Sequence, residues 1–259
     1  MRGCGGCLSA CMWGREAPFA APSTSKLNAT LLKAARKGDI KWAEMLVEKG
    51  AHVNCSNEFE QTPILKAAEG GHSDMIRRLV EMRADLACMD NKGSSPLHYA
   101  AYNGHAECCE VLVKLGCKMQ GLNVYGYTPL QYAAAQGETA TLKKLVELGA
   151  EVNFRNRANR TALHEAAENG FADTIAVLLS LGAKVRFNYD QPEYTPLHDA
   201  VYLGHIDAVQ VLIHGGADPW VKDQWGNTPM KLGKCAIDEG RTDLWEYLQT
   251  VADQTKSEG

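Results

Sequence analysis

The chain lacks the features that mark several large classes of protein. No apolar run approaches the roughly 20 residues of a membrane span, and the longest one near the N-terminus, Leu8 to Trp13, is interrupted by Ser9. Basic residues number 27 against 31 acidic ones, so the overall basic excess of many nucleic-acid binders is absent. We therefore expect a soluble chain with no membrane span and no direct nucleic-acid partner.

Sequence motifs of catalysis are also absent. There is no glycine-rich phosphate loop ending in Lys-Ser/Thr, no His-Glu-x-x-His and no Gly-x-Ser-x-Gly. His105 and Cys108 lie three apart on one helical face, but no second ligand pair at zinc spacing follows. We interpret Cys108 and Cys109 as small hydrophobic residues. The prediction is a protein that is not an enzyme and holds no cofactor or metal.

The nine cysteines are an odd number in a long chain, and no secretory signal with an apolar h-region precedes them. Reduced thiols in the cytoplasm or nucleus fit better than a disulfide framework. Cys4, Cys7 and Cys11 lie among Gly, Ala, Ser and Pro in residues 1–26, which we expect to be a disordered tail. S-acylation of these three cysteines is one alternative, although a single lipid chain anchors only marginally. The absence of acid before Glu16 hints at a transit peptide, a weaker alternative.

A repeat sets the organisation of the chain. A tetrapeptide that starts with Ser or Thr recurs at intervals of 33, 33, 33, 34 and 33 residues. Its copies begin at Thr62, Ser95, Thr128, Thr161, Thr195 and Thr228, with a degenerate copy at Ala29. Seven units are therefore expected over residues 27–250, followed by a short polar tail over residues 251–259.

Each unit predicts a helix, a turn, a second helix and a loop. The Ser or Thr suits an N-cap, and the Pro that usually follows suits the first helical position, where no backbone donor is needed. Small and apolar residues then fall at helical spacing, as in Leu97, Ala100 and Ala101, before Gly104 ends the first helix. The second helix carries an aliphatic stripe, as in Val209 to Ile213, and ends where glycine tolerates a left-handed conformation.

The segments SPLHYAAYNGH at Ser95–His105 and GAEVN at Gly149–Asn153 resemble the consensus of the ankyrin repeat family. The resemblance covers roughly residues 27 to 250. It implies an all-α solenoid of stacked helix-turn-helix units, with β-hairpin-like loops that project at right angles and form one wall of a groove. It also implies a monomeric, non-catalytic interaction scaffold or adaptor that binds a protein partner, since this fold serves many unrelated pathways.

Three departures from the repeat stand out. The first unit is basic, and the last is longer by about one helical turn, as terminal caps with a wetted outer face are. The loop over residues 188–194 carries one extra residue, which favours a specialised loop. The glycine expected before the helix cap is replaced by Glu60, Asn159 and Glu193, so we expect less regular turns there.

Tyrosine is concentrated on the positions that the resemblance assigns to the groove. Seven of the nine tyrosines fall there, which folding does not require, and tyrosine is enriched at binding hot spots. We predict a contiguous anchor patch that captures a segment of a protein partner, with Tyr202 and Trp225 as further contacts. The patch consists of Tyr99, Tyr102, Tyr125, Tyr127 and Tyr132. The alternative is that these side chains only stack on one another between units.

Three further hypotheses concern what the chain binds and what acts on it. Glu165, Glu168 and Asp199 make an acidic stretch edged by Tyr202, similar to ankyrin domains that read lysine-rich histone tails, although Arg160 stands where an aromatic would help. Negative charge thus lies in the fifth and sixth units, aromatic residues in the middle and positive charge in the first, so the partner surface is graded. A ubiquitin-ligase substrate-recognition subunit is another option, but no recruiting box is visible.

The third hypothesis treats the chain as a substrate. Asn153 follows Glu151 and Val152, and Leu145 lies eight residues before it. This pattern resembles sites of the asparaginyl hydroxylase that modifies ankyrin loops. The alternative is that Asn153 is a consensus residue that bonds only its own loop.

Overall fold

The computed structural model describes residues 23–187, 191–235 and 242–257, and within these segments the chain forms helices and no strand. The first helices of the seven units are α1 (Thr24–Lys37), α3 (Pro63–Gly70), α5 (Pro96–Tyr102), α7 (Pro129–Ala135), α9 (Ala162–Glu168), α11 (Pro196–Leu203) and α13 (Pro229–Cys235). The second helices are α2 (Ile40–Glu48), α4 (Ser73–Glu81), α6 (Ala106–Lys114), α8 (Thr139–Glu147), α10 (Ala172–Ser180), α12 (Ile206–His214) and α14 (Thr242–Ser257). None of the described helices is long and apolar enough to cross a membrane.

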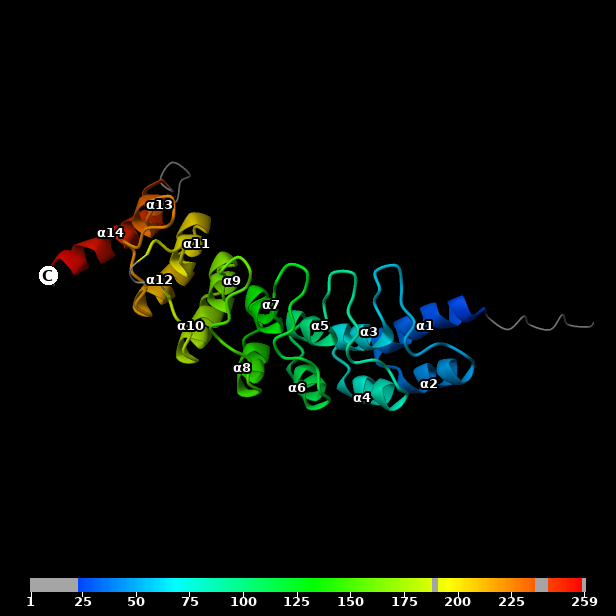
Figure 1. Ribbon diagram of the computed structural model, residues 1–259. Coiled ribbons are helices and arrows are strands. Elements are labelled where there is room, and N and C mark those ends of the chain that lie inside the picture. The colour runs from blue at the N-terminus through cyan, green and yellow to red at the C-terminus, as the bar shows by residue number, and fades with distance from the viewer. Residues whose placement is uncertain (1–22, 188–190, 236–241, 258–259) are drawn as a thin grey trace, which may run out of the picture.

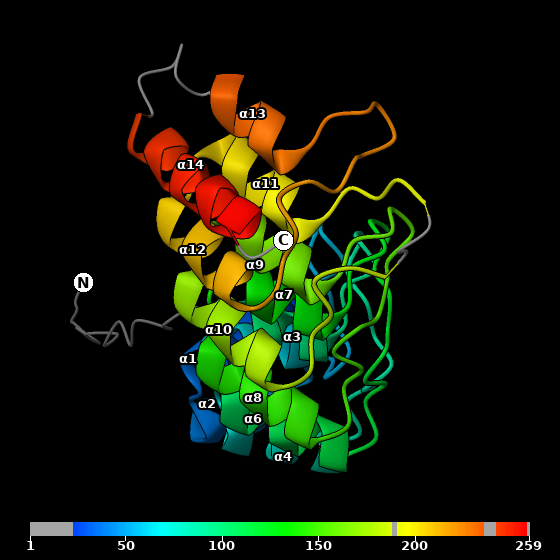
Figure 2. The ribbon, with the colours of Figure 1, turned by 90° about the vertical axis from the view of Figure 1, so that its left-hand side faces the viewer.

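The helices form two parallel rows. Each first helix packs on the first helix of the next unit and on the second helix of its own unit (Figure 1). The loops project from the side of the first helices, away from the second helices (Figure 2). The array bends so that the first helices and the loops lie on its inner side (Figure 1). The predicted all-α solenoid with projecting loops is therefore confirmed.

The helix ends follow the predicted local chemistry. Proline occupies the first turn of α3, α5, α7 and α11, after an extended Ser or Thr. Glycine in the left-handed conformation ends several first helices, and Gly71 (φ +77°) is an example. A Cβ added to Gly71 would lie 2.7 Å from the ring of His105 in the next unit, so this position excludes a side chain for two separate reasons.

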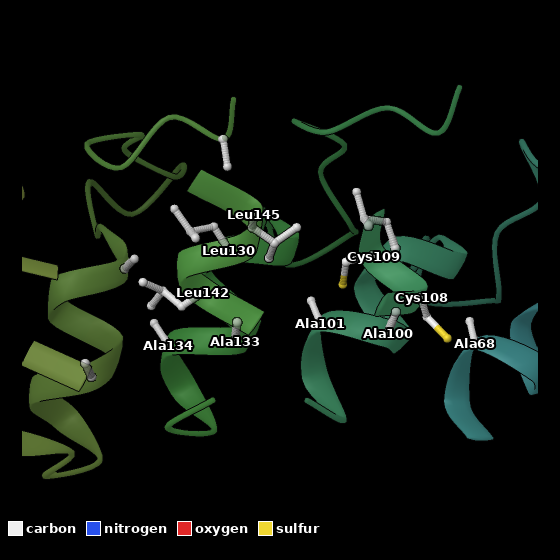
Figure 3. Close-up of a cluster of buried hydrophobic side chains, with 14 of the residues drawn as sticks. Ala68, Ala100, Ala101, Cys108, Cys109, Leu130, Ala133, Ala134, Leu142 and Leu145 are labelled. Atoms are coloured by element: carbon white, nitrogen blue, oxygen red, sulfur yellow. The ribbon is translucent and has the colours of Figure 1, made fainter. Parts of the chain in front are cut away.

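A continuous core runs between the two rows. The alanine pairs Ala100–Ala101 and Ala133–Ala134 are completely buried, and their small size lets α5 and α7 approach each other closely (Figure 3). Cys108 and Cys109 are also completely buried, and burial raises the pKa of each thiol to about 12. Their interpretation as small hydrophobic residues is therefore confirmed. The described residues contain no group of three or more potential metal ligands.

The loops of the described segments have a hairpin shape without a strand ladder, and both backbone and side-chain hydrogen bonds close them. In the loop before α5, the Asp90 carboxylate accepts the backbone N–H groups of Lys92 at 3.0 Å and Ser94 at 2.7 Å. One backbone hydrogen bond joins this loop to the next, from the N–H of Val124 to the carbonyl of Lys92 at 2.9 Å.

The expectation of irregular turns is wrong at two of the three positions. Glu60 (φ 59°) and Asn159 (φ 60°) adopt the left-handed conformation that Gly93 (φ 70°) adopts in its own loop. Glu193 does not adopt this left-handed conformation. Its buried carboxylate instead accepts the backbone N–H of Phe187 at 2.9 Å. The one-residue insertion thus coincides with a different way of closing the loop; residues 188–190 lie outside the described residues.

Both expected tail boundaries differ from the structure. Helix α1 begins at Thr24, inside the segment 1–26 predicted to be a tail. Helix α14 continues to Ser257 rather than ending at residue 250, because Leu244, Leu248 and Ala252 place one apolar face against the core. The polar sequence after residue 250 concealed this helical spacing.

Histidine side chains connect neighbouring units. His98 Nδ1 accepts the N–H of Ser95 at 3.1 Å, so Nε2 carries the proton and donates to the Tyr127 carbonyl of the next loop at 3.0 Å. His164 does the same with Thr161 and with the carbonyl of Tyr194. In the fourth unit Gln131 replaces the histidine, accepting the N–H of Thr128 at 3.0 Å and donating to the Arg160 carbonyl at 2.8 Å.

This natural replacement predicts how substitutions at His164 behave. His164→Gln should keep both hydrogen bonds and stay close to the wild-type stability. His164→Leu should lower the free energy of unfolding by about 1–3 kcal/mol, because it leaves a buried N–H and a buried carbonyl unpaired. Urea unfolding followed by circular dichroism checks the difference. Equal losses for the two variants would show that the hydrogen bonds do not matter.

Candidate functional site

The predicted tyrosine patch lies on first helices α5 and α7 and on the loop between α6 and α7. Tyr132 is its centre. The Tyr132 ring stacks on Tyr127 with centroids 5.6 Å apart and meets the Tyr102 ring edge-on at 5.6 Å. Its hydroxyl accepts a hydrogen bond of 2.7 Å from the Asn123 amide. Two units thus contribute rings to one cluster, as the contiguous patch and the stacking alternative both require.

The five tyrosines differ in what they expose. Tyr102 is 46% exposed and Tyr125 is 59% exposed, so both offer ring surface to a partner. Tyr99 instead uses its hydroxyl within the fold, donating to Asp90 Oδ2 at 2.9 Å and accepting from the Gln61 amide at 2.6 Å. Burial raises the pKa of Tyr99 to about 12. Tyr99 and Tyr132 therefore take part in hydrogen bonds of the fold, whereas Tyr102 and Tyr125 present exposed ring surface.

A cavity of about 270 Å³ opens beside this patch. Tyr99, Tyr102 and Tyr132 form its aromatic side, and Glu69, Asp90 and Lys92 form its charged side. A polar and aromatic recess of this size admits a single side chain of a partner rather than a drug-sized ligand.

The acidic stretch is built around Arg160. Its guanidinium donates from Nε to Glu165 at 2.9 Å, from one terminal nitrogen to Asp199 at 3.2 Å and from the other to Glu168. Glu165 and Asp199 are buried, whereas the Glu168 side chain is 47% exposed. We call these four residues the acidic cluster, since three carboxylates share one cation.

Arg160 stands where an aromatic side chain would help to bind a lysine-rich tail, and in the structure it holds the three carboxylates together across two units. Burial raises the pKa of Glu165, and it raises the pKa of Asp199 to about 6 against the opposing effect of Arg160. Glu165 and Asp199 therefore use their carboxylates within the fold. Glu168 alone of the three presents a large exposed surface.

A cavity of about 630 Å³ lies next to the acidic cluster. Arg160 and Asp199 line it together with Tyr194 and Trp225. The Trp225 side chain is 68% exposed, and its ring meets Tyr194 edge-on at 6.5 Å. Tyr202 is also exposed, on α11, as the prediction of further aromatic contacts requires.

A second ion cluster was not predicted as a unit. Glu69 accepts a hydrogen bond of 2.8 Å from Lys66 and lies 3.2 Å from the guanidinium of Arg36. We call Arg36, Lys66 and Glu69 the basic cluster, since two cations share one carboxylate. Arg36 and Glu69 come from different units, and their pairing was therefore not visible in the spacing of any single unit.

Asn153 uses both ends of its side-chain amide. It donates to the Gly182 carbonyl at 2.9 Å and accepts the N–H of Lys184 at 2.9 Å. These partners belong to the next unit, so the interpretation that Asn153 bonds only its own loop is wrong. Asn54 makes the equivalent bonds to Arg83 and Asp85. The cysteines proposed for acylation, Cys4, Cys7 and Cys11, lie outside the described residues.

Comparisons with known proteins agree with this architecture. A family model described as ankyrin repeats (3 copies) matches residues 31–121, 82–156 and 141–223. The crystal structure of the human ASB11 ankyrin repeat domain superposes with a TM-score of 0.69 and 26% identity, covering 78% of this chain and 90% of that one.

Two curated proteins match shorter segments. The potassium channel KOR2 of Oryza sativa subsp. japonica is 42% identical over 65 residues, which are 25% of this chain and 9% of the channel. An ankyrin repeat-containing protein of Schizosaccharomyces pombe is 44% identical over 41 residues, which are 16% of this chain and 20% of that protein. The matched segments thus span a fifth or less of these two relatives.

Removing Arg160 from the acidic cluster should cost more stability than removing Arg36 from the basic cluster. Arg160→Leu should lower the free energy of unfolding by about 3 kcal/mol, because it leaves two buried carboxylates without their cation. Arg36→Ala, at a side chain that is 63% exposed, should cost less than about 1 kcal/mol. Chemical denaturation of both variants measures the difference. Equal losses would mean that Arg160 does not neutralise the buried carboxylates.

Stability should also depend on pH through His164, whose pKa burial lowers to about 3. An unfolded histidine titrates near ~6.5, so the neutral buried ring stabilises the fold above that pH, and this stabilisation is lost as the pH falls toward 3. Asp199 acts in the opposite direction, because its raised pKa adds stability as the pH falls below 6.

Comparison with His164→Gln isolates the histidine contribution. Between pH 7.5 and pH 5, the stability of the wild type relative to this variant should fall by about 2 kcal/mol. Only the wild type has a side chain at this position that takes up a proton when the protein unfolds. Urea unfolding at a series of pH values measures the difference. A difference that stays constant across this range would contradict the assignment.

Proposed function

The chain belongs to the ankyrin repeat family, and on that basis we propose that it is a non-catalytic adaptor that captures an extended segment of a protein partner along its inner face. Protein–protein interaction is the general role of this fold. The observation that carries the specific proposal is the exposed aromatic surface of Tyr102 and Tyr125, of which the Tyr102 ring packs edge-on against Tyr132, itself stacked on Tyr127.

The geometry suits an anchor for a partner. Tyrosine provides large contact area with few rotatable bonds, and rings already fixed by their neighbours lose little freedom on binding. Tyr202 and Trp225 extend the exposed aromatic surface to α11 and to the loop before α13. Exposed aromatic groups that line one face of a soluble protein typically mark an interaction site.

A segment rich in lysine is a second candidate partner. The acidic cluster has two carboxylates more than cations. The exposed Glu168 carboxylate and the exposed Tyr202 occupy the same position in two successive units. The internal pairing of all three carboxylates with Arg160 weakens this candidate compared with the tyrosine patch.

Two remaining proposals rest on the family alone. One is a role as substrate-recognition subunit of a ubiquitin ligase. The other is hydroxylation of Asn153, whose amide would keep both of its hydrogen bonds if oxygen were added at Cβ. For location, we propose the cytoplasm or nucleus, since the cysteines of the described segments are free thiols.

The adaptor proposal predicts the effect of removing the exposed rings. Tyr102→Ala combined with Tyr125→Ala should reduce capture of the partner from cell lysate at least tenfold, as truncation of hot-spot residues does. Replacing Tyr99 or Tyr127 is a poorer test, because both support the fold. The quantity of recovered partner, measured by mass spectrometry, gives the result.

Met45→Ala supplies the control, since Met45 is an exposed apolar residue on α2, in the outer row of helices. It should leave capture unchanged. Thermal unfolding of each variant verifies that the fold is intact. Undiminished capture by the double tyrosine variant would refute the proposed binding surface.

A further inference from the structure

Two ion clusters of opposite composition lie on the two sides of the tyrosine patch. In the basic cluster two cations share Glu69, which leaves one positive charge in excess. In the acidic cluster three carboxylates share Arg160, which leaves two negative charges in excess. Lys33 and Lys37, both exposed on α1, add to the positive end. The inner face therefore has a charge gradient along its length.

The gradient follows the order of the first helices. The residue four positions after the start of each of the first six repeat copies, Ala29 to Thr195, changes in type from basic through aromatic to acidic. In order along the array these residues are Lys33, Lys66, Tyr99, Tyr132, Glu165 and Asp199. Because α1, α3, α5, α7, α9 and α11 pack in a row, this sequence order is also an order in space (Figure 1).

Building on the proposed function, we propose that the captured segment is extended and carries its charges in blocks. Acidic residues at one end lie over α1 and α3, an apolar or aromatic centre contacts the tyrosine patch, and Arg or Lys at the other end lies over α9, beside the exposed Glu168 carboxylate. Complementary charge contributes mainly to the specificity and the register of such an interface.

The spacing of the helices sets the length of the segment. Neighbouring packed helices lie roughly 8–10 Å apart, so the four intervals from α1 to α9 span about 32–40 Å. An extended chain rises about 3.3 Å per residue, and about 10–12 residues therefore cover the distance. Both charged blocks can consequently belong to one short segment.

The same gradient disfavours a segment that is basic throughout. Such a segment would reach the acidic cluster only by placing its remaining cations over Lys33, Arg36 and Lys37, where like charges repel. A lysine-rich tail can occupy the acidic end alone, without crossing the tyrosine patch. The two partner classes therefore differ in whether binding depends on the tyrosines.

Selection from a library of random twelve-residue peptides displayed on phage tests the proposal with the full chain as target. Enriched peptides should carry Asp or Glu in one half, Lys or Arg in the other and an aromatic or large apolar residue between. Mixed charges, charges of one sign or no enrichment over an unrelated protein would each overturn the proposed charge order.

Variants then assign each block to its cluster. Lys33→Glu with Arg36→Glu should weaken a selected peptide at least tenfold, and replacing the acidic block of that peptide by Gln should remove this sensitivity. Glu168→Lys should likewise weaken the peptide at least tenfold, and replacing the basic block of that peptide by Gln should remove this sensitivity. Lys41→Glu with Lys49→Glu, and Glu48→Lys, make matched charge changes at exposed positions in or next to α2 and should alter affinity less than twofold. Equal effects of matched and groove variants would overturn the assignment.

The tyrosine variant separates this proposal from the proposed function. Peptides that lose binding to the Tyr102→Ala and Tyr125→Ala protein, yet show no charge order, would leave the adaptor surface intact and refute the gradient alone. Peptides that bind this variant as well as the wild type would refute both.

Discussion

Contact between neighbouring units is the constraint on which the rest of the structure depends. A single helix pair of this size cannot bury its own apolar face, so the alanine pairs of α5 and α7 are covered only because the next unit packs on them. Hydrogen bonds add direction to that packing. His98 donates forward to the loop of the next unit, and His105 bonds backward to the Glu69 carbonyl at 3.1 Å. Each unit is thereby fixed in rotation as well as in distance.

Features set by a position that recurs in every unit could be predicted from the sequence, whereas the pairing of charged side chains between units could not. The N-caps, the prolines and the burial of Cys108 and Cys109 each depend on a local position that recurs every 33 residues, so the repeat itself reveals them. Arg160 and Asp199 are 39 positions apart and belong to different units. Their pairing depends on which side chains the stacking brings together, and spacing within one unit carries no signal for it. A search for opposite charges at groove positions of successive units would have found both ion clusters.

The tyrosine patch shows that structural and binding roles are not exclusive. Tyr132 meets Tyr102, Tyr127 and His98 within 6 Å between ring centroids, which is the stacking that the alternative interpretation required. Folding alone does not account for Tyr125, which is more than half exposed and presents its ring from a loop. The stacked Tyr127 and Tyr132 rings form a rigid base, and the exposed Tyr102 ring meets Tyr132 edge-on. Rigid aromatic groups of this kind bind with a small loss of conformational entropy.

The charged residues of the acidic cluster also combine a structural role with a proposed binding role. A partly buried ion network does not stabilise a fold more than apolar residues of equal volume would, because removing its charges from water opposes their attraction. Stability therefore does not explain why three carboxylates and a guanidinium occupy this position. The position of the cluster does have a geometric consequence: Glu165 acts electrostatically on Tyr127, and Asp199 acts on Tyr194. Arg160 holds both carboxylates between these two aromatic side chains, and the charge gradient and the aromatic surface are thus parts of one continuous face.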